Sequence, residues 1–126
     1  MEIVRYNNPG NIMQHTGTRF LGECASPHRR LTAFKSITYG VRAIAKILRT
    51  YRANGFTSYR AIIRRYAPPT ETNTEAYIKF VCQKCGAMPT DRVTDAQEYN
   101  LVAAICWYES HYRLTSGIWT AVKRLL

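Results

Sequence analysis

The chain has few acidic residues, no long apolar run and no leader-like start. It carries 8 Asp and Glu against 18 Lys and Arg, which gives a formal net charge of +10 over 126 residues. No apolar run reaches the roughly 18 residues that cross a bilayer, so we expect no membrane span. The opening MEIVRYNNPG lacks the pattern of a signal peptide, which predicts synthesis in the cytoplasm and delivery by another route.

The sequence also lacks the common motifs of metal and cofactor sites. It contains one Cys-x-x-C, CQKC, whereas Cys24 and Cys106 are isolated from it and from each other. Structural zinc sites usually combine two close pairs, so we expect no metal and no cofactor. No Ser/His/Asp set or phosphate-binding glycine loop is recognisable. We therefore expect reduced cysteines, with Cys82 and Cys85 packed as small apolar side chains near a helix end.

The excess of positive charge favours a polyanionic partner. Nucleic acid, an anionic membrane surface and the bacterial cell wall all meet that requirement. The basic residues are scattered, so solvated helix faces explain much of the charge equally well. We rank nucleic acid last, because no helix-turn-helix or β-platform motif is present.

The first 36 residues have turn and strand character. Asn-Asn-Pro-Gly-Asn at 7–11 is typical of a tight turn, because Pro fixes φ and Gly or Asn tolerates positive φ. TRFLGE and RRLTAF predict a small hairpin with Pro27 near its connection.

From Tyr39 onward the apolar period becomes helical. Thr57 is the expected N-cap of the second helix, and Thr72-x-x-Glu75 and Thr94-x-x-Gln97 fit capping boxes. Gly55 and Gly86 are expected to end helices. The length fits one domain, residues 1–126, of mainly α (α+β) class with a small β-hairpin. The five expected helices lie within 39–55, 57–69, 72–86, 94–113 and 115–126.

Glu109 interrupts the apolar face of the fourth helix. Steps of three and four from Val102 and Ile105 reach it, which puts a carboxyl beside the core near the helix C-terminus. Burial and the negative end of the helix dipole both favour the neutral form, so we expect a raised pKa, as a general acid requires. The alternative is an ion pair with Arg113 at i+4.

Two stretches resemble known families. AAICWYESHY resembles the catalytic-glutamate helix of the lysozyme-like superfamily, which includes lytic transglycosylases and goose-type lysozymes. RYNNPGNIMQ, GTRFLGE, LTAFKSITYGVRAIAKILRTY and AIIRRYAPPTETNTEAYIKFV resemble a family of small phage virion-associated and prophage proteins over roughly residues 5–86. The resemblance implies one compact lysozyme-like domain.

The order of the motifs differs from that of related enzymes. In flagellar-type glucosaminidases the glutamate helix precedes an Asn-Asn-x-x-Gly-Ile segment and a small hairpin. Here Asn7, Asn8, Gly10 and Ile12 come first, and Glu109 lies near the end. This order predicts a circular permutation, which is tolerated where chain termini lie close together.

The resemblance implies a glycosidase that cleaves the glycan strands of peptidoglycan, either a muramidase or a lytic transglycosylase. Glu109 is then the general acid. Glu23, in the expected hairpin, is the candidate second group, although an exposed hairpin carboxylate explains it equally well. Lytic transglycosylases need one glutamate because the 6-hydroxyl of the substrate attacks. The sequence leaves the choice open.

Amide and aromatic side chains are the candidate substrate ligands. Asn7, Asn8 and Asn11 have the groups that bind sugar hydroxyls, although turn and capping chemistry explains them equally well. We expect Tyr39, Tyr77 and Tyr108 to line a saccharide groove, with helix-core packing as the alternative. We assign Glu71 and Glu75 to a helix cap, and expect His111 to point away from Glu109.

The expected partners are peptidoglycan glycan strands and other virion proteins. The expected location is the phage virion, or the periplasm and cell wall after delivery. The alternative function is a non-catalytic virion or tail structural protein, or a module that binds the cell wall.

Overall fold

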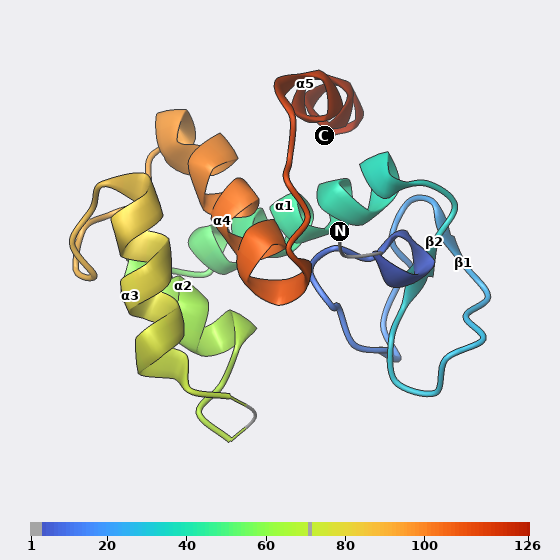
Figure 1. Cartoon of the computed structure of the whole chain (residues 1–126), viewed down its shortest axis with the longest axis horizontal. Helices are drawn as coiled ribbons and strands as arrows, with labels where there is room; N and C mark the ends of the chain where they lie inside the picture. The colour runs from blue at the N-terminus through green and yellow to red at the C-terminus, as the bar shows by residue number, and fades with distance from the viewer. Residues whose placement is uncertain (1–3, 71) are drawn as a thin grey trace.

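The computed structural model describes residues 4–70 and 72–126, which form a mainly helical protein with one small sheet (Figure 1). This architecture confirms the fold class expected from the sequence. None of the helices in the described ranges is both long and apolar enough to cross a bilayer. The elements are η1 (Arg5–Asn7), β1 (Glu23–Cys24), β2 (Ala33–Phe34), α1 (Ile37–Ala53), α2 (Tyr59–Tyr66), α3 (Thr74–Cys85), η2 (Asp95–Gln97), α4 (Glu98–Ser110) and α5 (Ser116–Leu125).

The elements form two sides joined by α1 (Figure 1). We call α2, α3 and α4 the helical side, and residues 4–36 the hairpin side. In Figure 1, α1 runs behind both sides, and α5 lies above it. Close contacts between α3 and α4 and between α1 and α5 hold the helices together. The C-terminal end of α4 lies where the two sides meet.

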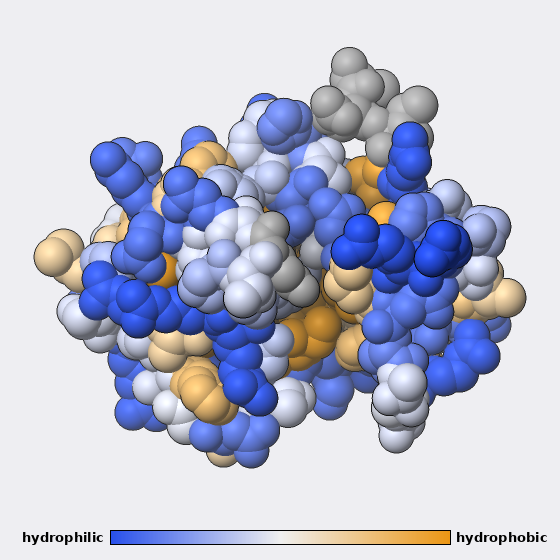
Figure 2. Space-filling model, turned by 90° about the horizontal axis from the view of Figure 1, so that it is seen from below, coloured by the Kyte–Doolittle hydropathy of each residue, from blue (hydrophilic) through white to orange (hydrophobic). Residues whose placement is uncertain are grey.

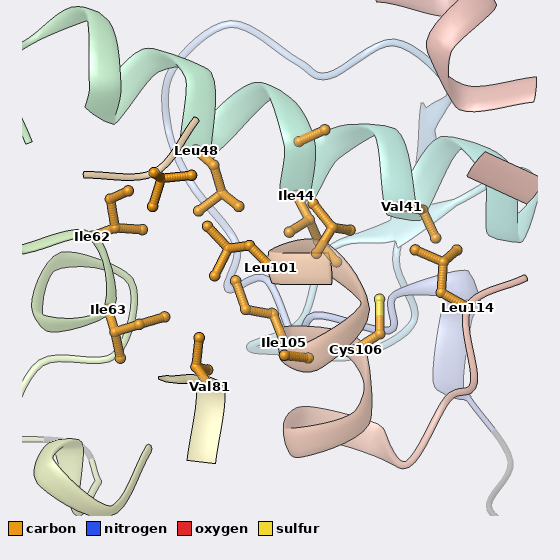
Figure 3. Close-up of a cluster of buried hydrophobic side chains, with 14 of the residues drawn as sticks. Val41, Ile44, Leu48, Ile62, Ile63, Val81, Leu101, Ile105, Cys106 and Leu114 are labelled. Carbon is orange, nitrogen blue, oxygen red and sulfur yellow. The ribbon is translucent and has the colours of Figure 1, made fainter. Parts of the chain in front are cut away.

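The core lies between α1, α2, α3 and α4 (Figure 3). Val41, Ile44 and Leu48 of α1 are fully buried, as their helical spacing predicts. Ile105 of α4 is buried too, so the apolar face that leads to Glu109 does face the core. The periodic signal was reliable here because burial of that face is what holds each short helix in place.

The helix starts differ from the expected ones by about one residue. Ser58, not Thr57, caps α2 by accepting from the N–H of Ala61 at 3.1 Å. Asn73, not Thr72, caps α3. Both expectations failed because a neighbouring polar residue was an equally good cap. The C-terminal expectations are confirmed: Gly55 and Gly86 have φ of +94° and +62°.

The expected capping box at Thr94 is also wrong. Residues Asp95–Gln97 form the 3₁₀ turn η2, and the side chain of Thr94 makes no capping hydrogen bond. The α4 helix starts at Glu98, after this turn, whereas the expected helix opened at Thr94. Glu98 is buried and receives hydrogen bonds from Arg49 of α1, with Nε to Oε2 at 2.8 Å and Nη2 to Oε1 at 2.9 Å. This paired ion contact fixes the start of α4 against α1.

The expected hairpin is confirmed, with very short strands. Glu23 pairs with Phe34 and Cys24 with Ala33, and a separate bridge joins Met13 to Leu31. Because the strands are so short, side-chain hydrogen bonds of Asn8 hold much of this side together. Its buried amide donates to the carbonyls of Ile12 and Thr32 at 2.9 and 2.8 Å, and its Oδ1 accepts from the N–H of Ile12.

The segment 7–10 lies directly on α1. A Cβ on Gly40 would collide with the backbone oxygen of Asn7 and would lie 2.9 Å from Cδ of Pro9. A Cβ on Gly10 would collide with the hydroxyl of Tyr66. Gly40, four residues after Ser36 at the start of α1, is therefore needed for packing, because another stretch of backbone approaches it closely.

We predict that Gly40→Ala lowers the free energy of unfolding by about 1–3 kcal/mol, because the added methyl group must displace rigid backbone. Urea denaturation of the purified variant measures this change. Gly17→Ala is the matched control, since its nearest side-chain atom is Nδ1 of His15 at 3.9 Å. Equal unfolding midpoints for the two variants would contradict the close approach.

Candidate active site

Glu109 lies in the last turn of α4, half-buried, with donors at both carboxylate oxygens. Nδ2 of Asn11 donates to Oε1 at 3.1 Å and also to the Glu109 backbone oxygen at 2.9 Å. The hydroxyl of Tyr77 on α3 donates to Oε2 at 2.8 Å. Two segments far apart in the sequence therefore hold the carboxylate that α4 carries. Such donors fix the orientation of the carboxylate.

The loop that carries Asn11 is tied to both helices beside it. The hydroxyl of Ser110 donates to the carbonyl of Pro9 at 2.7 Å, and that of Tyr66 donates to the carbonyl of Gly10 at 2.7 Å. Asn11 itself has φ of +50°, which asparagine tolerates better than most residues. The Asn-Pro-Gly-Asn turn thus presents Asn11 to Glu109.

Glu109 opens into a cleft of about 830 Å³ between the helical side and the hairpin side. Figure 2 shows hydrophobic surface near the centre of the face seen from below, between two larger hydrophilic masses. Among the described residues that line the cleft, Glu109 is the one acidic side chain. The lining is Gly10, Asn11, Ile12, Met13, His28, Arg30, Leu31, Ile47, Tyr51, Arg65, Tyr66, Ala67, Pro68, Thr72, Tyr77, Tyr108 and Glu109.

Of the three tyrosines expected to bind substrate, Tyr77 and Tyr108 line the cleft. Their rings stack with centroids 3.9 Å apart. Tyr77 is only 1% exposed, so its ring belongs to the core and its hydroxyl serves Glu109. Tyr108 is half-buried. Tyr39 does not line the cleft; its ring packs against Gly22, where a Cβ would collide with it.

Of the three asparagines expected to bind substrate, only Asn11 lines the cleft. Asn8 satisfies the backbone of its own loop and of Thr32. Asn7 donates from Nδ2 to the carbonyl of Phe34 at 3.0 Å. Asn7 and Asn8 therefore have the structural role that was the alternative to substrate binding: they hydrogen-bond the backbone of the turn and its neighbours.

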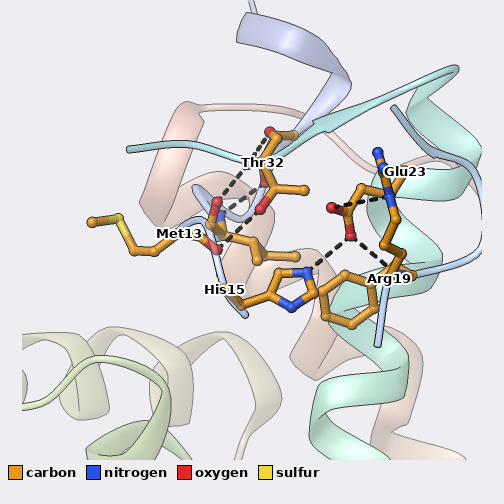
Figure 4. Close-up of polar contacts among 8 residues, drawn as sticks. Met13, His15, Arg19, Glu23 and Thr32 are labelled. Carbon is orange, nitrogen blue, oxygen red and sulfur yellow. Dashed lines mark hydrogen bonds and ion pairs between the residues drawn. The ribbon is translucent and has the colours of Figure 1, made fainter. Parts of the chain in front are cut away.

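Glu23 does not line the cleft, and its carboxylate has local partners (Figure 4). Oε1 lies 2.9 Å from Nε2 of His15 and accepts from the Phe20 N–H at 3.0 Å, and Oε2 lies 3.7 Å from Nε of Arg19. Burial acts to raise the pKa of Glu23, but these hydrogen bonds and charges outweigh it and lower the pKa. Glu23 thus orders the hairpin loop as an ionised group.

Three other residues discussed at the sequence level, Glu75, Arg113 and His111, have contacts elsewhere on the molecule. Glu75 is exposed on α3 and pairs with Arg64 at 3.4 Å, whereas Glu71 lies outside the described residues. Arg113, the alternative partner for Glu109, has its guanidinium 5.2 Å from the Trp107 ring centre. His111 ends α4 with φ of +53° and its ring 5.0 Å from that of Trp107.

Sequence reasoning missed the arginines of the cleft and two of its tyrosines, Tyr51 and Tyr66. Arg30 contributes from the hairpin side, and Arg65 from α2. The Arg65 guanidinium lies 4.6 Å from the Phe56 ring centre and 5.6 Å from that of Tyr51, which restricts its orientation. The local sequence around Tyr66 could not predict its role, because its hydrogen-bond partner, Gly10, is 56 residues away.

The cysteines are free thiols within the core or beside it. Burial raises the pKa of Cys85 to about 11 and that of Cys106 to about 12, so both are neutral near pH 7. In the part of the chain that the structure describes, no group of three His, Cys, Asp or Glu residues could hold a metal ion.

The tyrosines around Glu109 stay protonated over a wide pH range. Burial, followed by the charges of Tyr66 and Glu109, raises the pKa of Tyr77 far above its ordinary value. Burial and the charge of Glu109 likewise raise the pKa of Tyr66. Both hydroxyls are therefore available as hydrogen-bond donors at neutral pH.

We predict that stability falls as pH rises above about 10, the ordinary tyrosine pKa. The unfolded chain loses these phenolic protons there while the folded chain retains them, so deprotonation favours unfolding. Spectroscopic titration of tyrosinate, combined with urea denaturation at each pH, measures the effect. The Tyr77→Phe variant should lose less stability over the same rise in pH, because it lacks one of these phenol groups. Complete phenol ionisation in the folded protein near pH 10 would contradict the prediction.

Comparison with known proteins gives one informative match. No protein-family model matches the chain. The chain is 36% identical over 106 residues to Protein P5 of Pseudoalteromonas phage PM2. The match covers 81% of this chain and 66% of P5, so the chain spans about two thirds of the length of that relative. The chain is thus similar to a phage protein over most of its own length.

Proposed function

We propose that this chain, a relative of a bacteriophage protein, is a phage-derived glycosidase that cleaves the glycan strands of peptidoglycan. One observation carries the proposal. Glu109 is half-buried in a cleft between two sides of the molecule, with Asn11 and Tyr77 directed at its two oxygens. A positioned carboxyl in a cleft is the minimum apparatus for protonating a glycosidic oxygen.

The partners of Glu109 suit a group that gives up a proton and takes one back. Nδ2 of Asn11 can only donate, so it fits an unprotonated Oε1 whether Glu109 is neutral or ionised. Oε2 therefore carries the proton. The Tyr77 hydroxyl can donate to the carboxylate or accept from the acid, and so keeps this oxygen oriented throughout.

A single carboxylate among the described residues of the cleft favours lytic transglycosylation over hydrolysis. Among the described lining residues no second acid faces Glu109, and Glu23 has its partners in the hairpin loop. Glu109 would protonate the leaving oxygen as the C1–O bond breaks. The resulting carboxylate would accept the proton of the C6 hydroxyl as that oxygen bonds to C1, leaving a 1,6-anhydro sugar. No water is consumed.

The lining of the cleft suits a polymer that bears both sugar rings and negative charge. Tyr108 and Tyr51 contribute aromatic surface, which packs well against sugar rings. Arg30 and Arg65 give the walls a basic character. The net charge of +10 favours association with an anionic cell wall. As partners we propose the glycan strands and other virion proteins, with the virion or the cell envelope as the location.

The alternative is a non-catalytic virion component that binds the cell wall or other virion proteins. The observation that favours it is the absence of a second acid among the described lining residues, because most glycosidases use a pair of carboxyls. A lytic assay separates the two functions, since only the enzyme solubilises peptidoglycan.

We predict that Glu109→Gln lowers the rate of peptidoglycan clearing by about 10²–10⁴-fold, the usual contribution of a general acid. Zymograms and turbidity assays measure this loss at matched concentrations of folded protein. Glu75→Gln is the control, because it makes the same change at an exposed residue outside the cleft. Clearing by Glu109→Gln at the wild-type rate would remove Glu109 from the mechanism.

A second prediction concerns the products. Digestion of purified sacculi should release muropeptides with a 1,6-anhydro end and no new reducing end, because the substrate's own hydroxyl is the nucleophile. Mass spectrometry of the soluble fraction, with and without borohydride reduction, distinguishes the two ends. Reducible ends would instead indicate hydrolysis and a second catalytic group.

A further inference from the structure

A second groove, of about 460 Å³, lies beside the Glu109 cleft along α1. Its polar lining includes three cationic side chains, from Arg19 of the hairpin loop and from Arg42 and Lys46 of α1. Phe20, Leu21, Ile47, Thr50 and Tyr51 complete the lining. We call this feature the basic groove.

The basic groove adjoins the cleft. Ile47 and Tyr51, one turn apart on α1, line both of them. The Tyr51 ring is half-buried and in contact with the Arg65 guanidinium, which itself lines the cleft. The cleft and the basic groove are therefore neighbours that share the side chains of Ile47 and Tyr51, so a branched ligand in the cleft lies next to the groove.

The chemistry of the lining selects a carboxylate-bearing ligand with aliphatic parts. No acidic side chain occurs among the described residues that line the groove. Nε of Arg42 donates to the carbonyl of Leu125 at 2.9 Å, which leaves the Nη groups of this anchored guanidinium for a ligand. Arg19 is 63% exposed and lies only loosely against Glu23, at 3.7 Å. Leu21, which also lines the groove, exposes 49% of its surface to solvent.

We infer that the basic groove binds the acidic peptide branch of the polymer whose glycan strand occupies the cleft. The inference rests on the proposed function, because peptidoglycan carries short peptides with free carboxylates and aliphatic side chains on alternate sugars. Cationic side chains pair with the carboxylates, and Leu21 and Phe20 contact the alanine methyl groups. The groove thereby distinguishes peptide-bearing glycan from bare glycan.

The test compares wild type with the double variant Arg19→Ala/Lys46→Ala on two substrates. One is intact peptidoglycan, and the other is glycan strands freed of peptides by an amidase. The variant should lose roughly three- to tenfold in kcat/KM on the intact substrate, the effect of two exposed charge contacts, and nothing on bare strands. Equal losses on both substrates, or no loss on the intact one, would overturn the inference.

Lys79→Ala/Arg124→Ala is the matched control. It removes the same charges from exposed positions that line neither the cleft nor the groove, and it should behave as wild type on both substrates. A loss in this control equal to that in the groove variant would assign the effect to net charge and overturn the inference.

A binding measurement separates failure of the inference from failure of the proposed function. A free alanyl-glutamyl stem peptide is titrated into labelled wild-type protein, with an amidated, uncharged peptide as comparison. Shifts in the amide resonances of residues 19–21 and 42–51 that the double variant abolishes support the basic groove, even if no glycan is cleaved. Absence of these shifts in wild type overturns it, whatever the lytic activity.

Discussion

The contact between the 7–11 segment and the helices beneath it is the constraint on which the site depends. Backbone meets backbone where Asn7 lies on Gly40, and two hydroxyls, from Tyr66 and Ser110, bind the carbonyls of Gly10 and Pro9. This docking brings the hairpin side to the end of α4. Without it Asn11 would not reach Glu109, and the cleft would have one wall.

The polar groups around Glu109 are paired in a way that makes its partial burial tolerable. A half-buried carboxylate is costly unless donors replace the water it loses. Asn11 and Tyr77 supply those donors, and Asn8, fully buried one turn earlier, satisfies the backbone on which Asn11 sits. Asn11 and Tyr77 thus position the acid, and Asn8 stabilises the loop that carries Asn11.

Glu23 and Glu109 have different surroundings and therefore different roles. Glu23 has a histidine, an arginine and a backbone N–H within reach, so it is held in its ionised form and orders the hairpin loop. Glu109 has neutral donors and an open cleft. The proposed transglycosylation uses only the second, which is consistent with a hairpin carboxylate that serves structure. The circular permutation remains a prediction from motif order.

The sequence by itself determined the helices, the hairpin and the placement of Glu109 beside the core, because hydrophobic periodicity and turn residues act locally. It missed the caps of α2 and α3 by one residue, since adjacent Ser, Thr and Asn compete for one role. Only the tertiary structure decided which polar residues surround the acid. Asn11 and Tyr77 lie 98 and 32 residues from Glu109, and no local pattern encodes a contact that arises when loop closure and packing bring distant segments together.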